Sequence, residues 1–381
     1  MHHFKQWIIV LGIIGLILGG CGHDEQKTAA PPQPLDVSQL NVISVQELDL
    51  LTGPLRITAY LAPDGQHFAY INGDGLCIYT LSGEREHCFD LGERLLKAFD
   101  SETVRWSPDS RYLTIGIHLV RYPRIADIWV ADTTAGTLSN LTEEEIANEP
   151  RWIDCGARFV GKKLVFIRYP ADAEGVQVAA VMSINPDGSA LQEIGTLTIS
   201  QALSILALAP APDQKSWAFN YLQEDTDDPD QGVWLVNARF QNPRQIGAIP
   251  STPWWIEFSP DGQYLMTYAD ELQIYKVEDG RVFLADQHYS VRGGAWAPSG
   301  HAFVYLVNDE RLGEENGLYL SAGPGEPGRL VLPGMFLPPT ARGRQPLMWA
   351  SNNTILLGSV PPDQTIIVQL GAQASSATPE S

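Results

Sequence analysis

The sequence predicts an all-β protein, a β-propeller of four-stranded antiparallel blades, and three observations carry that prediction. A short turn signal of the Pro-Asp-Gly type recurs seven times. Runs of β-branched and aromatic residues flank the signals, as expected for strands. Consecutive signals lie 38 to 59 residues apart. Short strands that repeat at about 40–50 residues are typical of propeller blades.

The turn signals predict the first hairpin of each blade. Their anchor residues are Asp64, Asp109, Asp154, Asp213, Asp261, Ser299 and Asn352. Proline presets φ at the start of such a turn, while Asp and Gly tolerate its left-handed position, so two strands are joined tightly. A β-sandwich with coincidental turns is the alternative, but a sandwich does not require one motif at blade spacing.

A third strand is expected after each hairpin, at residues 76–80, 127–131, 180–184, 232–236, 271–275, 317–320 and 365–370. A fourth strand closes most blades, for example at residues 86–91 and 281–285. The last unit has no fourth strand, whereas a strand-like segment at residues 41–48 belongs to no blade. Pairing that segment with the last blade would close the ring and remove exposed edges. We therefore expect seven blades; six or eight stay open because the unit at 153–167 is degenerate.

The N-terminus predicts an export signal. Lys5 precedes a 12-residue apolar run at residues 7–18, too short to span a bilayer and fitting the core of a signal peptide. Leu18-Gly19-Gly20-Cys21 follows and resembles a bacterial lipobox, which implies cleavage before Cys21 and lipidation of its thiol. An ordinary signal peptide with an incidental cysteine is the alternative.

Four segments are therefore expected. Residues 1–20 form the lipoprotein signal peptide, residues 21–39 a flexible tether, residues 40–370 a single propeller domain, and residues 371–381 a disordered tail. The predicted location is extracytoplasmic, with a lipid anchor as the only contact with the cell membrane or outer membrane.

Composition narrows the class of partner. The chain has 25 Lys and Arg against 45 Asp and Glu, a formal net charge of −20. Nucleic acid and anionic lipid both require clustered basic residues, so we expect neither as a partner.

The cysteines predict one disulfide. If Ser82-Gly83 is a two-residue turn, Cys77 and Cys88 face each other on neighbouring strands, and an oxidising compartment favours their bond. Two unpaired buried thiols are the alternative. Cys155 lies in one of the turn signals and is expected to be structural.

The repeats, as in Ser259-Pro260-Asp261-Gly262-Gln263-Tyr264-Leu265, resemble the WD-like propeller repeats of the TolB family, which also occur in prolyl oligopeptidase-type enzymes. The resemblance covers about residues 40–370 and implies the propeller fold. In TolB such a propeller engages a peptidoglycan-associated lipoprotein, whereas this chain carries its own lipobox-like segment. The repeats indicate no chemistry, because Pro-Asp-Gly is a requirement of the turn.

The sequence carries none of the common catalytic motifs. The sequence has no Gly-x-Ser-x-Gly elbow, Walker loop, His-Glu-x-x-His or Cys-x-x-Cys, so we expect no cofactor and assign no catalytic residue. His118 and His288 are distant metal-ligand candidates on separate blades, but surface or core histidines are favoured. Asp225, Asp227 and Asp230 alternate like Ca²⁺ ligands, yet the Gly and Glu of an EF-type loop are missing, and a solvated loop is favoured.

The expected binding surface is the face that carries the long loops between the second and third strands, at residues 117–126, 169–179, 222–231 and 307–316. Aromatic and Arg side chains there would anchor a partner. The candidates are Arg121, Tyr122, Arg124, Arg168, Tyr169, Trp254, Trp255, Tyr289 and Arg292. We expect one of Trp254 and Trp255 to belong to the core and the other to be exposed.

The sequence thus favours a membrane-anchored, non-enzymatic propeller lipoprotein that binds an envelope protein, peptide or glycan on its long-loop face. The alternative is an extracytoplasmic enzyme, a lyase or hydrolase acting on saccharides, with its site at the mouth of the central channel.

Overall fold

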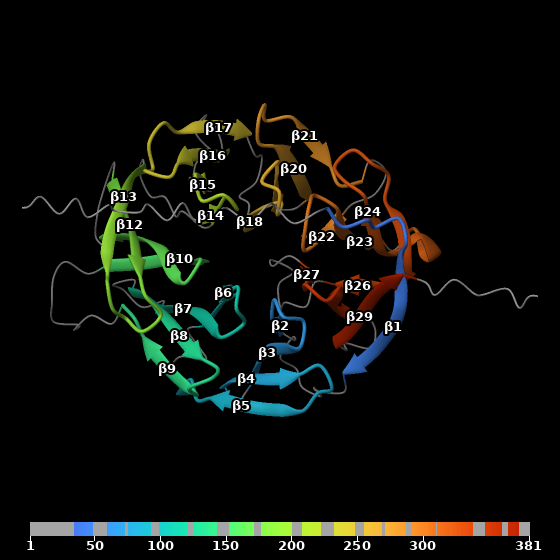
Figure 1. Ribbon diagram of the computed structural model, residues 1–381, viewed down its shortest axis with the longest axis horizontal. Coiled ribbons are helices and arrows are strands. Elements are labelled where there is room, and N and C mark those ends of the chain that lie inside the picture. The colour runs from blue at the N-terminus through green and yellow to red at the C-terminus, as the bar shows by residue number, and fades with distance from the viewer. Residues whose placement is uncertain are drawn as a thin grey trace, which may run out of the picture. The chain divides into compact units, whose positions relative to one another are not determined.

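The computed structural model describes residues 34–48, 59–72, 75–92, 99–119, 125–142, 152–170, 177–199, 208–221, 232–247, 255–268, 271–286, 291–309, 311–337, 347–359 and 365–372. These residues form an all-β, seven-bladed propeller, as predicted, with four antiparallel strands in each blade (Figure 1). The expected alternatives of six or eight blades are thereby excluded.

Blades 1 to 3 come first along the chain. Blade 1 contains β2 (Ala59–Leu61), β3 (His67–Asn72), β4 (Gly75–Thr80) and β5 (Arg85–Phe89). Blade 2 contains β6 (Phe99–Trp106), β7 (Tyr112–Leu119), β8 (Ile125–Asp132) and β9 (Thr137–Asn140). Blade 3 contains β10 (Trp152–Val160), β11 (Lys163–Pro170), β12 (Gln177–Ile184) and β13 (Gln192–Ile199).

Blades 4 to 6 repeat this order from the inner to the outer strand. Blade 4 contains β14 (Leu208–Pro210), β15 (Ser216–Tyr221), β16 (Gly232–Asn237) and β17 (Arg244–Gly247). Blade 5 contains β18 (Trp255–Phe258), β19 (Tyr264–Tyr268), β20 (Leu272–Lys276) and β21 (Val282–Leu284). Blade 6 contains β22 (Val291–Trp296), β23 (Phe303–Val307), β24 (Gly317–Ser321) and β25 (Arg329–Pro333), with a short 3-10 helix, η1 (Gly313–Glu315), between β23 and β24.

The first of the described strands completes the last blade. In blade 7 the inner position is shared by two short strands, β26 (Phe336–Leu337) and β27 (Met348–Trp349), which pair with different parts of β28 (Thr354–Ser359). β29 (Thr365–Ala372) follows β28, and the outer strand is β1 (Leu40–Leu48). β1 pairs with β29 in antiparallel register from Leu40 opposite Ala372 to Leu48 opposite Thr365. The predicted closure by the N-terminal strand is therefore confirmed.

The Pro-Asp-Gly turns owe their shape to two residues. The carboxylate of Asp261 accepts a hydrogen bond from the backbone N–H of Gln263 at 3.0 Å, and Asp64, Asp109 and Asp213 make the same bond. The residue after the Asp has a positive φ, as at Gly262 (φ 72°). Blade 4 instead places Gln214 there (φ 57°), which costs an L-residue roughly 1–2 kcal/mol.

Blade 3 departs from the prediction. The expected turn at Asp154-Cys155-Gly156 is wrong, because these residues lie inside β10, where a bulge falls between Cys155 and Arg158. The hairpin turn is Gly161-Lys162, since Val160 pairs with Lys163. Gly156 has the positive φ of a turn glycine (67°), but here it serves the bulge. Moving the anchor from 154 to 162 changes the neighbouring spacings from 45 and 59 residues to 53 and 51.

The apolar core is divided among the interfaces between neighbouring blades. One cluster joins Ala209, Val233 and Phe258 of blades 4 and 5, and the largest joins blades 6 and 7. Tryptophans strengthen two of these interfaces. The indole N–H of Trp106 donates to the Tyr60 carbonyl at 2.9 Å, and that of Trp296 donates to the Glu257 carbonyl at 3.2 Å. Within the part of the chain that the structure describes, no helix has the length and hydropathy to span a bilayer.

Candidate functional site: an axial charge cluster

Many of the predicted site residues fall outside the described residues. These are Cys21, Arg121, Tyr122, Arg124, Trp254, Tyr289, His288, Asp225, Asp227 and Asp230. His118 lies in β7 and Arg292 in β22, but their side chains are not among those described. The long-loop face therefore stays a prediction.

The two hairpin cysteines form a disulfide. Cys77 and Cys88 are directly opposite in the pairing of β4 with β5, and their sulfur atoms are 1.98 Å apart. Cys155 makes no disulfide with another described cysteine and is half-buried at the bulge of β10.

Arg168 belongs to an internal ion pair. Its Nε and Nη2 donate to the two carboxylate oxygens of Asp154 at 2.8 and 2.7 Å, and the Asp154 side chain is only 2% exposed. Burial raises the pKa of Asp154, while hydrogen bonds from Arg168 and Thr142 oppose that rise. Arg168 is therefore engaged with the buried Asp154 carboxylate, which gives it a structural role. Tyr169, the next residue, is half-buried near the end of β11.

Trp255 is the core member of the Trp254-Trp255 pair. It is 2% exposed and packs in the cluster that contains Met266 and Trp296, between blades 5 and 6. It therefore offers almost no surface to a partner.

The inner strands of the blades can be compared at one structurally equivalent position. In blades 2, 3 and 5 an aromatic residue near the end of the inner strand, Trp106, Phe159 or Phe258, pairs with a leucine. The residue just before that aromatic residue is charged in all three blades. These residues are Arg105, Arg158 and Glu257, and we call them the axial charge cluster. The corresponding residues of the other blades are Tyr60, Ala209, Ala295 and Met348.

The axial charge cluster lies on the strands that surround the ring axis, β6, β10 and β18 (Figure 1). Glu257 is exposed to water, yet the surrounding protein disfavours its charge and raises its pKa. Propeller blades surround a central channel, and charged side chains on the inner strands are placed to line it. Arg105 and Arg158 are half-buried.

The cluster carries more positive than negative charge. Burial, and then the charge of Arg105, lower the pKa of Arg158 well below its usual range, whereas Glu257 acts in the opposite direction. A guanidinium stays protonated in proteins, so Arg158 keeps its positive charge in this enclosed position. The Nε of Arg158 donates to the Leu208 carbonyl of blade 4 at 2.9 Å, which holds the side chain in place.

Two guanidinium groups on neighbouring blades suit an anionic group. Their planar donors match carboxylates, and the enclosed position strengthens the attraction. Sequence reasoning missed this cluster, because the misplaced turn at Asp154 shifted Arg158 out of line with Arg105 and Glu257. Among the described residues, no three His, Cys, Asp or Glu side chains gather in a way that could hold a metal ion.

The fold and the cluster together define the class of protein as a seven-bladed β-propeller with a charged axis. Among solved structures, the chain is similar to an oligogalacturonate lyase in complex with manganese, with a TM-score of 0.54 and 14% identity, over 87% of this chain and 95% of that chain. An oligogalacturonate lyase from Vibrio parahaemolyticus gives a TM-score of 0.55 and 15% identity, over 87% and 97%. A chain of the Mitotic Checkpoint Complex gives 0.52 and 13%, over 86% and 91%.

At these identities the likeness shows the fold alone. No protein-family model and no curated protein matches the sequence. The resemblance to TolB-type repeats therefore stays a prediction.

Proposed function

We propose that this chain is a lipid-anchored, extracytoplasmic, non-enzymatic propeller that binds an acidic envelope partner, which is a protein, a peptide or a glycan. The observation that supports it is that Arg105 and Arg158 occupy equivalent positions of the inner strands of adjacent blades. In a chain with a net charge of −20, an enclosed excess of positive charge is a feature that a carboxylate-bearing partner would use.

The long-loop face is the second part of the proposal. Its sequence segments carry Arg121, Arg124 and Arg292 beside Tyr122 and Tyr289, a set that would extend contacts to an acidic partner. Lipidation of Cys21 would hold the propeller at the membrane. Metabolic labelling with a radioactive fatty acid tests this step: the label should enter the wild-type chain and be lost in Cys21→Ala.

Binding is tested with the purified full chain and two acidic probes, oligogalacturonate and a polyglutamate peptide, against an uncharged oligosaccharide of the same length. Titration calorimetry should detect binding of at least one acidic probe. Replacing Arg158 by Gln should weaken it about tenfold, because a charge-assisted hydrogen bond is lost. Glu257→Gln should strengthen it, because a like charge is removed.

Arg239→Gln is the matched control, since Arg239 is an exposed arginine of blade 4 away from the inner strands. It should bind as the wild type does. Equal affinity for charged and uncharged probes, or an Arg158→Gln variant that binds unchanged, would refute the role of the axial charge cluster.

An enzyme acting on saccharides is the second candidate, favoured by the fold likeness to the two oligogalacturonate lyases. One of them holds manganese, but the described residues of this chain do not gather three metal ligands, so we assign no metal-dependent step. Incubation with oligogalacturonate and Mn²⁺ separates the candidates. New unsaturated ends would indicate a lyase and new reducing ends without unsaturation a hydrolase, while neither is expected of a binding protein.

A further inference from the structure

The axial charge cluster lies near one mouth of the ring. Arg105 and Glu257 are the second-last residues of β6 and β18, and Arg158 is the third-last residue of β10. These inner strands end at the first turn of their blades, and we call this side of the ring the turn face. From Phe99 at the start of β6 to Arg105 the strand rises roughly 20 Å, which separates the cluster from the long-loop face.

The cluster carries a surplus of one positive charge. Among the described side chains of the inner strands, the charged ones are Arg105, Asp154, Arg158 and Glu257. Asp154 is neutralised by Arg168, which leaves two cations and one anion. One carboxylate would balance this surplus, whereas a second carboxylate would lie near Glu257 in an enclosed position without a counter-charge. The charge of the cluster therefore favours a ligand that presents a single carboxylate.

Arg158 has hydrogen-bond donors for such a carboxylate. Its Nε donates to the Leu208 carbonyl at 2.9 Å, while the described residues supply no acceptor for its Nη1 or Nη2. Arg168 shows how a guanidinium of this chain holds a carboxylate, with Nε and Nη2 on the two oxygens of Asp154. The Nη1–Nη2 end of Arg158 can make the same two-point contact, because the bond from Nε fixes the orientation of the group.

A polypeptide C-terminus matches this site better than an acidic glycan does. A polypeptide carries one carboxylate at its end, whereas an oligogalacturonate carries one on every unit. Beside the terminal carboxylate, the peptide main chain has N–H and C=O groups that can pair with the edge of a strand. The inner strands β14 and β18 each lie at the end of their described sheet, so one edge of each is directed toward the axis (Figure 1).

We propose that the axial charge cluster binds the C-terminal carboxylate of a partner polypeptide, which enters the ring from the turn face. The carboxylate lies against Nη1 and Nη2 of Arg158 and near Arg105, while Glu257 limits the site to one anion. This inference rests on the proposed function, because it names the partner of the same cluster. It adds the single carboxylate, the chain end and the side of entry.

Calorimetric titration of the wild-type full chain tests the single carboxylate. The first probe is an N-acetylated hexapeptide of Gly and Ser that ends in Ala with a free carboxylate, and the second is its C-terminal amide. The free acid should bind, and the amide should bind at least about tenfold more weakly, because charge-assisted hydrogen bonds are lost. Glucuronate, a sugar with one carboxylate, should also bind at least about tenfold more weakly than the free-acid peptide, because it lacks a main chain.

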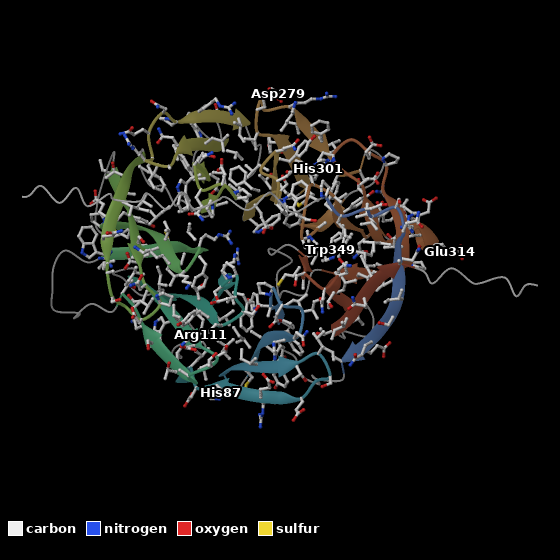
Figure 2. All side chains as sticks on the ribbon, viewed as in Figure 1. His87, Arg111, Asp279, His301, Glu314 and Trp349 are labelled. Atoms are coloured by element: carbon white, nitrogen blue, oxygen red, sulfur yellow. A yellow bond between two sulfur atoms is a disulfide. The ribbon has the colours of Figure 1, made fainter. Side chains whose placement is uncertain are left out.

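Variants locate the site on the molecule. Arg158→Gln should bind the acid and the amide equally. Arg281→Gln is the matched control and should bind the acid as the wild type does. Arg281 is an exposed arginine of the β20–β21 turn, two residues after Asp279, which Figure 2 shows at the outer rim of the ring. Glu257→Gln raises the surplus to two charges, so the preference of the wild type for a peptide ending in Ala over one ending in Glu should be lost.

A photoreactive benzoylphenylalanine, placed three residues before the C-terminus of the peptide, maps the side of entry. It should crosslink to turns of the turn face, such as residues 107–111, and not to the long loops at residues 117–126 or 222–231. Crosslinks on the long loops would overturn entry from the turn face.

Two further results would overturn the inference and leave the proposed function standing. One is equal binding of the acid and the amide while oligogalacturonate or polyglutamate still binds through Arg158. The other is binding of glucuronate as tight as that of the free-acid peptide, which would assign the cluster to an acidic sugar. If neither the acidic probes nor the peptides bind, the inference and the role of the cluster in the proposed function fail together.

Discussion

Arg168 and Asp154 face each other across the β10–β11 pair of blade 3 and form a two-point ion pair, with N–O distances of 2.8 and 2.7 Å. The guanidinium also lies 5.9 Å from the ring centre of Trp152. The pair thus links the two strands of the blade whose turn has the least recognisable sequence.

Removing the cation from this pair should destabilise the protein. In Arg168→Met the buried Asp154 carboxylate loses its partner, and we expect a loss of about 3–5 kcal/mol in the free energy of unfolding, measured by urea denaturation. The double variant Asp154→Leu/Arg168→Met should recover part of that loss, because no buried charge is left unpaired. An Arg168→Met chain as stable as the wild type would show that the pair contributes nothing.

Two turn glycines should differ in their tolerance of alanine. Both have a positive φ, but a Cβ on Gly262 would come no closer than 3.6 Å to Pro212, whereas a Cβ on Gly65 would meet the Asn352 side chain at 1.9 Å. Gly262→Ala should cost about 1–2 kcal/mol from backbone strain alone. Gly65→Ala should cost more, because Asn352 must move and lose its 2.8 Å hydrogen bond to the Gly65 carbonyl. Thermal unfolding of the pair checks the order.

Ring closure depends on the buried ends of β1. Leu48 is 4% exposed and packs between blades 1 and 7, whereas Val45 of the same strand is 47% exposed. Leu48→Asp should destabilise the chain by about 3 kcal/mol or more, because it buries an unpaired carboxylate, and it should promote aggregation through the opened edge of β29. Val45→Asp is the control and should elute as the wild type does in gel filtration.

Reduction of the disulfide should destabilise blade 1. Cys77 and Cys88 are 11 residues apart in sequence, and a closed loop of that size contributes about 3 kcal/mol by restricting the unfolded chain. The Cys77→Ala/Cys88→Ala variant should therefore unfold at lower urea concentration, and dithiothreitol should have no further effect on it. If dithiothreitol lowered the urea concentration of unfolding further in this variant, the effect of the reductant would not come from the Cys77–Cys88 disulfide.

Acid should weaken blade 2 through Asp132. The hydrogen bond from Arg111 lowers the pKa of Asp132 below its ordinary value of 3.8, so folding favours the ionised form. The stabilisation is complete above that ordinary value and is lost as the pH falls through the lower pKa of the folded state. Arg111→Gln should therefore flatten the decline of stability below about pH 4, measured by urea denaturation at several pH values. An unchanged slope would contradict this assignment.

The fold was predictable because the residues that define each turn are adjacent in the sequence. Asp261 and Gly262 each have a role that few other residues fill, so the signal repeats wherever the hairpin repeats. Closure by β1 was predictable for a different reason: the last unit had one strand too few and the N-terminus one too many.

Blade 3 and the axial charge cluster were harder to predict from the sequence. Asp154-Cys155-Gly156 imitates a turn, since a β-bulge and a hairpin both use a glycine of positive φ. Only the pairing of Phe159 with Leu164 aligns Arg158 with Arg105, so the cluster depends on long-range register that local patterns do not contain.

The pairing of β1 with β29 joins the first and the last of the described strands, 317 residues apart from Leu48 to Thr365 in the order of synthesis. Until the C-terminal segment has been synthesised, β1 lacks its partner and blade 7 lacks its outer strand. Early blades can form their local hairpins during synthesis, but the ring itself closes only after translation of β29. A chain interrupted before Thr365 would therefore leave an open arc with β1 unpaired, a ready substrate for quality-control proteases.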